Sequence, residues 1–388
     1  MGWLIFLYWL QFALIGYALA GYGLIWMALA AVFGRKAEFR HTETGLHATM
    51  LIAARNEAAS IKAKLVTVLA QDCGPHQIDV LVVSDGSQDA TLDQARSLND
   101  PRITAFQTDS HGGKAAALNA GLAQIGKPDV VIFSDANSLL QPGAVRALLA
   151  PFADKMVGGV CGKPEPILKK GGWLARVERL FWAYDSALKS SETVLGGAVS
   201  AQGTLYAMRA HLIPEQVPAT VADDFYISVH APLRGYRLVF APGAVAREEV
   251  THRIGDEFMR RVRSTERGWR ALMQVRGLMN PRVHGLYAVQ LASHKALRRL
   301  VAFLLPLFFL SSVAVAGQGL IYAVMLMAQT AFYGFALGAI YLPKIRALPG
   351  AGLAAFFVMG HAAMGLGILR AAFGVKSARW SPVREATE

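Results

Sequence analysis

The sequence predicts a doubly wound α/β domain flanked by apolar helices, one N-terminal and about three C-terminal. Two short apolar runs, residues 78–85 and 129–135, each end on an aspartate, and strand-like and helix-like stretches alternate over residues 48–152. Apolar stretches occupy both ends of the chain. Continuous Val, Ile and Leu runs are typical of central strands in a parallel sheet that is covered on both faces. The alternation favours a doubly wound arrangement.

The individual elements follow from local patterns within residues 48–152. Strands are expected at residues 50–54, 78–85, 102–107 and 129–135, and helices at about 57–70, 89–97, 114–124 and from Pro142 onward. Ligands of such sheets bind outside the carboxyl ends of the strands, so Asp85 and Asp135 are expected to project into one crevice. Carboxylates there suit ribose hydroxyls and a divalent metal on a diphosphate.

The two ends of the chain predict membrane segments. The chain has 388 residues, of which 54% are hydrophobic and 17% charged, against roughly 25% charged in ordinary soluble domains. Residues 2–34 carry no charge, and we interpret them as a transmembrane anchor; a cleaved signal peptide is the alternative, but the run is long and lacks a basic n-region. Residues 299–317, 319–342 and 350–373 predict three further spans.

Basic residues predict the orientation of these spans. Arg35, Lys36 and Arg40 follow the anchor, which favours a multi-pass protein of the plasma or inner membrane with the middle domain in the cytosol. The last span contains His361 and Arg370, so it crosses the bilayer, re-enters it or lies along the interface. The chain has a net charge of +12, and many of its basic residues lie beside the apolar spans. This placement favours a membrane surface and anionic phosphates as partners, rather than nucleic acid.

The expected organisation has five parts. They are an anchor at 1–34, the α/β domain at 45–250, amphipathic or interfacial helices at 251–298, a transmembrane region at 299–374 and a tail at 375–388. Within the third part, arginines recur on one stripe of a predicted helix at 256–276, namely Arg260, Arg263, Arg267 and Arg270. Such a stripe suits lipid headgroups or a diphosphate, and a solvated basic face is the alternative.

Three motifs carry candidate chemistry. Lys114 follows two glycines near a helix start, where its ammonium and backbone N–H groups suit a diphosphate. Asp135 and Asn137 place two oxygen donors after a strand, which suits a Mg²⁺ or Mn²⁺ shared with phosphates. The alternative is an Asx turn, which favours the same residue types at the end of a strand. Asp223 and Asp224 form a like-charge pair, in which repulsion raises one pKa toward that of a base; solvated helix caps are the alternative.

In this order the motifs resemble those of the inverting family-2 glycosyltransferases of the GT-A (Rossmann-like) fold. Among these, the membrane-embedded hyaluronan, chitin, cellulose and poly-N-acetylglucosamine synthases are the most similar in layout. The resemblance covers about residues 48–275 and the flanking spans. It implies that the loop with Ala54, Asn56 and Glu57 binds the nucleotide, that Asp85 holds the nucleoside and that Lys114 lies near the donor.

The resemblance continues through the second half of the domain. Asp135 stands where the metal motif of the family begins, and Asp223 and Asp224 stand at the Thr-Glu-Asp position, which implies that Asp224 is the catalytic base. The stretch from Gly203 to residue 209 is similar to the acceptor-side loop. Arg260 and Arg263 lie in a counterpart of the Gln-x-x-Arg-Trp motif and are expected near the diphosphate. Asn137, Asp223 and Ser264 replace an Asp, a Glu and a Trp of the family pattern.

The resemblance implies a membrane enzyme that moves a sugar from a nucleotide sugar, expected to be a UDP-sugar, to a growing polysaccharide with inversion. Asp224 would take the acceptor proton, while a metal, Lys114 and Arg263 stabilise the leaving diphosphate. Two alternatives stay open. Ser264 and the modest number of spans favour a single addition to a lipid-linked glycan, and a nucleotide-regulated transporter is the third possibility, although the spans hold almost no acids or bases. A partner subunit or a homo-oligomer also stays open.

Overall fold

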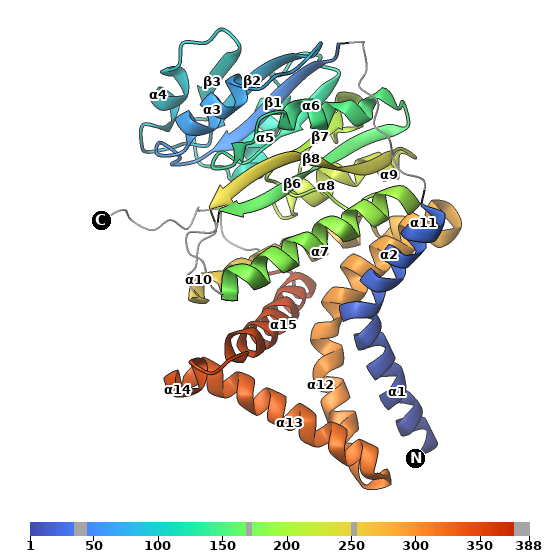
Figure 1. Cartoon of the computed structure of the whole chain (residues 1–388). Coiled ribbons are helices and arrows are strands. Elements are labelled where there is room, and N and C mark those ends of the chain that lie inside the picture. Colours follow the sequence, from blue (N-terminus) through green and yellow to red (C-terminus); the bar gives the residue numbers. More distant parts are fainter. Residues whose placement is uncertain (35–44, 168–172, 250–253, 376–388) are drawn as a thin grey trace. The chain divides into compact units, whose positions relative to one another are not determined.

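The computed structural model describes residues 1–34, 45–167, 173–249 and 254–375 (Figure 1). These residues form two compact units. The helical unit contains Met1–Ile25, Arg253–Arg270 and Leu291–Lys376, and the α/β unit contains Trp26–His252 and Ala271–Gln290. The basic residues Arg35, Lys36 and Arg40, on which the predicted orientation rests, lie outside the described residues, as does the predicted tail beyond residue 375.

The α/β unit is built on an eight-stranded sheet of order β3-β2-β1-β4-β7-β6-β8-β5. Its strands are β1 (His47–Ala54), β2 (Gln77–Ser84), β3 (Ile103–Gln107), β4 (Val130–Phe133), β5 (Leu139–Leu140), β6 (Val157–Ile167), β7 (Tyr206–Arg209) and β8 (Arg237–Glu249). The first four strands run parallel, with Ala48 opposite both Ile78 and Val130. The expected strands of the first half are therefore confirmed, and their carboxyl ends share one edge.

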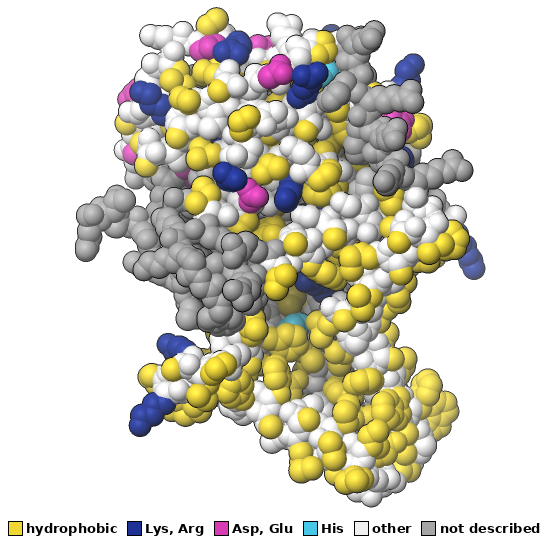
Figure 2. Space-filling model, viewed as in Figure 1, with side chains coloured by type: hydrophobic (Ala, Val, Ile, Leu, Met, Phe, Trp, Pro, Cys, Tyr) yellow, Lys and Arg dark blue, Asp and Glu magenta, His cyan; other side chains and the backbone are white. Residues whose placement is uncertain are grey.

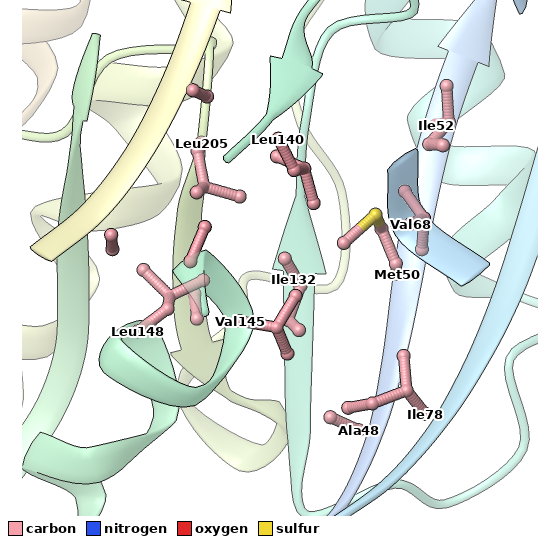
Figure 3. Close-up of a cluster of buried hydrophobic side chains, with 14 of the residues drawn as sticks. Ala48, Met50, Ile52, Val68, Ile78, Ile132, Leu140, Val145, Leu148 and Leu205 are labelled. Carbon is pink, nitrogen blue, oxygen red and sulfur yellow. The ribbon is translucent and has the colours of Figure 1, made fainter. Parts of the chain in front are cut away.

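The first four helices of this unit follow the strands in the order expected. The unit contains α3 (Ile61–Leu69), α4 (Thr91–Arg96), α5 (Lys114–Leu122), α6 (Ala144–Leu149), α7 (Trp173–Leu195), α8 (Asp223–Ser228) and α9 (His230–Leu233). Apolar residues of α3 and α6 pack on one face of the sheet, where Val68 and Leu148 meet Met50, Ile52 and Ile132 (Figure 3). Burying these side chains fixes the strands so that the polar residues after them occupy defined positions.

The second half of the sheet contains strands that the sequence did not indicate. Strand β7 runs antiparallel to β4 and β6, and β6 pairs in parallel with β8. Strand β6 includes three glycines and two prolines, and β8 has Pro242 and Gly243 in its middle, so neither shows a plain alternating pattern. Proline and glycine weaken the strand signal because one cannot donate a ladder hydrogen bond and the other has no side chain to pack.

The helical unit has its own core around Tyr8 of α1 (Gly2–Gly16) and Phe308 of α12 (Arg298–Val315), whose ring centroids lie 4.9 Å apart. The other helices of this unit are most of α10 (Ile254–Gln274), α13 (Leu320–Tyr341), the short α14 (Pro343–Arg346) and α15 (Ala351–Ala372). Most of α2 (Tyr22–Phe33) and of α11 (Pro281–Leu291) belongs to the α/β unit. The described residues include four helical stretches that are long and apolar enough to cross a membrane. Figure 2 shows hydrophobic side chains over the exposed surface of these helices.

A buried ion network accounts for the charge in the last apolar helix. Arg370 of α15 donates from Nε to Glu266 Oε2 of α10 at 3.1 Å, and Arg270 Nη1 lies 3.1 Å from the other carboxylate oxygen. Glu266 is fully buried. The two helices approach closely, because a Cβ on Gly367 would lie 2.7 Å from the carbonyl oxygen of Val262. Arg370, whose charge left the topology of the last predicted span undecided, is thus paired with Glu266 inside the helical unit.

Candidate active site

Four charged side chains from three separate stretches of the chain meet at the carboxyl edge of the sheet. Lys114 Nζ lies 2.7 Å from Asp135 Oδ1 and 3.2 Å from Asp223 Oδ2. Asp224, next to Asp223, also attracts the ammonium electrostatically. The fold thus places Lys114, Asp135, Asp223 and Asp224 together, whereas the pair expected to share a crevice was Asp85 and Asp135.

Local structure explains how each of these side chains reaches the edge. Asp135 follows the buried strand β4, and Lys114 is the first residue of α5 after Gly113, whose φ of +91° suits a glycine. Asp223 and Asp224 are the first two residues of α8, where acidic side chains interact favourably with the helix dipole. Strand ends and helix starts thus direct all four charges toward one place.

Gly203 allows these groups to approach one another. Its backbone N–H donates to Asp224 Oδ2 at 3.1 Å. A Cβ at this position would lie 3.0 Å from Asp135 Oδ2 and 3.3 Å from Lys114 Nζ. A larger residue would therefore push against the ion pair between Lys114 and Asp135.

The electrostatics favour a base at Asp224. Burial and the neighbouring charge of Asp223 raise the pKa of Asp224 to about 6, although Lys114 and the N–H of Phe225 oppose this rise. The Phe225 N–H donates to Asp224 Oδ1 at 2.7 Å. Burial lowers the pKa of Lys114, but attraction by Asp135 and Asp223 outweighs it and raises that pKa above its ordinary value. At neutral pH the carboxylate is thus ionised, and the lysine is charged.

The charges border a small pocket with two polar atoms that have no hydrogen-bond partner. It is lined by Leu51, Ala53, Lys114, Leu118, Phe133, Ser134, Asp135, Gly203, Tyr206 and Asp223. Among the described residues, neither Asp223 Oδ2 nor the hydroxyl of Tyr206 has a hydrogen-bond partner, and both are buried. Burial and the nearby Asp223 raise the pKa of Tyr206, so its phenol stays protonated. The pocket therefore offers a hydroxyl donor and a carboxylate oxygen whose neighbour is the ammonium of Lys114 at 3.2 Å.

Asp85 directly follows β2, and its side chain contacts the segment that leads into α5. Its carboxylate accepts hydrogen bonds from the backbone N–H groups of Gly112 and Gly113, both at 2.8 Å, and its Oδ2 lies 2.8 Å from His111 Nδ1. The residue is only 1% exposed. Asp85 therefore holds the segment that leads into Lys114, and neither of its oxygens is open toward the pocket.

The predicted nucleotide loop braces the same edge. The Ala54 carbonyl accepts the Asp85 N–H at 2.9 Å, and Asn56, with a φ of +50°, donates its N–H to Ser87 Oγ at 3.1 Å. The Glu57 N–H donates to Thr91 Oγ1 at 2.7 Å. These bonds hold the loops after β1 and β2 together at the carboxyl edge. A donor-binding role for these residues stays a prediction.

The side-chain amide of Asn137 donates a hydrogen bond to Glu248, a residue that the sequence patterns did not single out. Nδ2 donates to Glu248 Oε1 at 3.1 Å, at the end of β8. The sequence also gave no role to Tyr206 or to Lys64, which is fully buried. Lys64 lies on the apolar face formed by Ile61, Leu65 and Val68. A lysine among apolar residues at helical spacing could have been recognised in the sequence as a buried charge. Glu248 and Tyr206 carry no such local signal.

The predicted basic residues Arg260 and Arg263 lie on α10 in the helical unit. Their expected contact with a diphosphate stays a prediction, because the site itself belongs to the α/β unit.

The donor set suits a hard divalent cation that is shared with phosphates. Asp135, Asn137 and Asp223 carry side-chain oxygen atoms, and the buried Asp223 Oδ2, 3.2 Å from Lys114 Nζ, accepts no hydrogen bond within the described residues. Within the described ranges, no three acidic, histidine or cysteine side chains form a complete metal site. Mg²⁺ commonly takes only one or two carboxylates and completes its shell with phosphate and water. The residues therefore fit such a cation together with a diphosphate.

Comparison with known proteins identifies the family of this arrangement. The family described as Glycosyltransferase like family 2 matches residues 47–271. Poly-beta-1,6-N-acetyl-D-glucosamine synthase of Staphylococcus aureus is 26% identical over 232 residues, which cover 58% of this chain and 55% of that protein. The chain thus spans about half the length of these curated relatives. An O-antigen chain rhamnosyltransferase of Salmonella typhimurium is 23% identical over 224 residues, 55% of this chain and 69% of that protein.

A solved structure shares the fold over almost the whole chain. It is a mannosyltransferase from Pyrobaculum calidifontis in complex with GDP-Man and Mn²⁺, with a TM-score of 0.69 and 20% identity over 95% of this chain and 100% of that one. The expected α/β fold of the GT-A type is therefore confirmed, with helices at both ends that are long enough to span a membrane.

Proposed function

Because the chain belongs to the family-2 glycosyltransferases, we propose that it transfers a sugar with inversion from a nucleotide-sugar donor to a growing polysaccharide, with Asp224 as the general base. The observation that carries this proposal is the convergence of Lys114, Asp135, Asp223 and Asp224 around Gly203. Relatedness to a poly-beta-1,6-N-acetyl-D-glucosamine synthase supports the polysaccharide acceptor. Family membership also favours an enzyme over the transporter alternative.

The base role of Asp224 follows from its surroundings. A pKa of about 6 leaves the carboxylate ionised at neutral pH and close to the range in which general bases work well. The Gly203 N–H holds one oxygen in place. Asp224 accepts the proton of an acceptor hydroxyl as that oxygen attacks the anomeric carbon. One displacement inverts the configuration, so a second nucleophile is not required.

Lys114 and the metal motif serve the leaving group. The ammonium of Lys114 stabilises the negative charge that develops on the nucleoside diphosphate. Asp135 and Asn137 would hold Mg²⁺ or Mn²⁺, which when bound supplies positive charge to the diphosphate. The mannosyltransferase of the same fold was solved with GDP-Man and Mn²⁺, which supports a divalent metal here. Donor binding requires Lys114 to share its charge between Asp135, Asp223 and the phosphates.

We extend the proposal to a UDP-sugar and to a nucleoside contact at Asp85. Because the carboxylate of Asp85 is fully engaged by residues 111–113, it reaches a nucleoside only when that segment releases at least one hydrogen bond. The proposed location is the plasma or inner membrane with the catalytic domain in the cytosol, supported by the apolar helices and the basic residues after the first of them.

A second candidate is a single addition to a lipid-linked glycan. It is favoured by Ser264, an exposed residue of α10 at the position where processive relatives were expected to carry a tryptophan. The length of the product made by purified protein separates the two: a polymer supports the first candidate, and a product with one added sugar supports the second.

The experiment that tests the function assays a panel of nucleotide sugars for diphosphate release and product in membranes. Asp224→Asn should abolish transfer, while Asp100→Asn, at a partly exposed aspartate paired with Arg102, should leave it unchanged. Transfer that survives in Asp224→Asn would show that another group is the base. Absence of release with every donor would contradict the enzyme assignment.

A further inference from the structure

Lys64 is a charged side chain buried where hydrophobic residues would be expected. It lies on α3 between Ile61, Leu65 and Val68, and it is fully buried. Its Nζ donates to Ser134 Oγ at 2.6 Å. Within the described part of the chain, no carboxylate lies within ion-pair distance of this ammonium. Burying an ammonium without a counter-ion opposes folding, so a lysine here calls for a reason other than stability.

The hydrogen bond from Lys64 continues into the active site. Ser134 Oγ accepts from Lys64 and donates to the carbonyl oxygen of Thr204 at 2.6 Å. Ser134 immediately precedes Asp135, and Thr204 immediately follows Gly203. The chain of hydrogen bonds therefore connects helix α3, the end of β4 and the loop whose N–H holds Asp224.

Neighbouring groups complete this connection. Thr204 Oγ1 lies 3.4 Å from Glu248 Oε2, and the other oxygen of Glu248 accepts from Asn137. Burial lowers the pKa of Lys64 to about 7, although Asp135 and Glu248 attract its charge. The electrostatic neighbours of the buried Lys64 side chain are thus Asp135 of the metal motif and Glu248, the hydrogen-bond partner of Asn137.

We propose that Lys64 is a positioning residue of the donor site, which acts through Ser134 to hold Asp135 and Gly203 at the spacing that the transfer reaction needs. The inference rests on the proposed function for its kinetic consequences, but not for the hydrogen bonds themselves. Lys64 does not touch the substrate. It acts on the reaction by restricting the two segments that carry the metal carboxylate and the partner of the base.

The unfolding temperature distinguishes this positioning role from that of a lysine that only stabilises the fold. Because burial lowers its pKa, Lys64 weakens folding at neutral pH, and replacing it by methionine of similar length should raise the unfolding temperature. A lysine that stabilises the fold would instead give a lower unfolding temperature. Gain of stability together with loss of catalytic efficiency is the expected pair of results.

The experiment compares Lys64→Met, Ser134→Ala and the double variant in the full-length protein. Each single variant should raise amide hydrogen exchange in residues 134–140 and 200–206 and lower kcat/KM for diphosphate release about tenfold. The double variant should be no worse than either single one, because both break the same chain of hydrogen bonds. Unchanged exchange in both segments, or a double variant that loses about a hundredfold, would overturn the proposal.

Binding of Mn²⁺ without a donor, measured by electron paramagnetic resonance, distinguishes a positioning role of Lys64 from a direct effect of its charge on the metal. Loss of positioning weakens Mn²⁺ binding in Lys64→Met and in Ser134→Ala alike. Removal of a repelling charge would tighten Mn²⁺ binding in Lys64→Met and leave Ser134→Ala unchanged, which would contradict a positioning role.

Val68→Ala is the matched control, because Val68 lies one turn further on α3 and is also buried. It should lower the unfolding temperature without changing exchange at 134–140 or 200–206. If it reproduces the effects of Lys64→Met, loosening of α3 explains them and the proposal fails. Failure of the proposed function appears separately, as absence of sugar transfer in the unaltered protein, while hydrogen exchange still decides the role of Lys64.

Discussion

The backbone N–H of Gly203 donates to Asp224 Oδ2 at 3.1 Å across 21 residues of sequence. This bond joins the loop before β7 to the first turn of α8. On its other side, Gly203 leaves room for the ion pair between Lys114 and Asp135. Gly203 thus lies between the proposed base and the proposed donor-binding charges, which explains how residues so far apart in sequence lie close together.

Gly203→Ala should lower kcat/KM about tenfold or more, because the added methyl group displaces the Lys114–Asp135 pair and small misplacements of reacting groups are costly. The matched control is Gly277→Ala, since a Cβ at Gly277 meets no atom within 4 Å. Steady-state rates of diphosphate release measure both. Equal rates for the two variants would show that the close approach at Gly203 has no catalytic consequence.

The pH dependence of the reaction should report Asp224. A base must be deprotonated, so kcat/KM should rise with pH through about 6 and level off above it. Asp223→Asn should move this rise to lower pH, because the charge of Asp223 raises the pKa of Asp224. A profile that does not move in Asp223→Asn would argue that the titrating group is not Asp224.

The dependence of sugar transfer on a divalent metal should require the carboxylate of Asp135. Removal of divalent cations should stop transfer, and Asp135→Ala should weaken binding of Mn²⁺ about tenfold or more, since it deletes a carboxylate oxygen from the donor set. Titration with Mg²⁺ and Mn²⁺ measures the change, and Asp100→Ala serves as control because the carboxylate of that aspartate pairs with its neighbour Arg102. An unaltered titration in Asp135→Ala rules out the metal role of this residue.

The helical unit should depend on Glu266. Glu266→Gln leaves the arginines at 270 and 370 without their buried counter-charge, and breaking a buried ion pair typically costs about 3 kcal/mol. The unfolding temperature of purified protein in detergent should therefore fall. Arg247→Gln, which removes a half-exposed pair with Glu165, should have little effect. A Glu266→Gln protein as stable as the parent would show that the pair contributes nothing to packing of α10 on α15.

The sequence predicted those parts of the site that lie directly after a strand or before a helix. Asp135 follows β4, and Asp223 and Asp224 open α8, so their edge of the sheet could be inferred from local patterns alone. The surroundings of Asp85 could not, because its carboxylate is held by backbone N–H groups of Gly112 and Gly113, and no side-chain pattern encodes those.

Long-range partners account for the remaining gaps. Glu248 is joined to Asn137 across 111 residues, and Lys64 to Ser134 across 70 residues. The Asn137–Glu248 pair depends on β8, in which a proline and a glycine hide the strand pattern, as the glycines and prolines of its neighbour β6 do there. The order of these strands determines which side chains meet at the metal motif, and that order is a property of the folded sheet rather than of any short stretch.

The role of Asp224 is tested most directly by the rate of sugar transfer by Asp224→Asn, with donor binding measured on the same preparation. We predict that transfer falls about a thousandfold or more, because the acceptor hydroxyl has no base, while donor affinity stays within about threefold of the parent. Transfer at a near-normal rate would contradict this prediction. Loss of donor binding together with transfer would place Asp224 in the donor site instead.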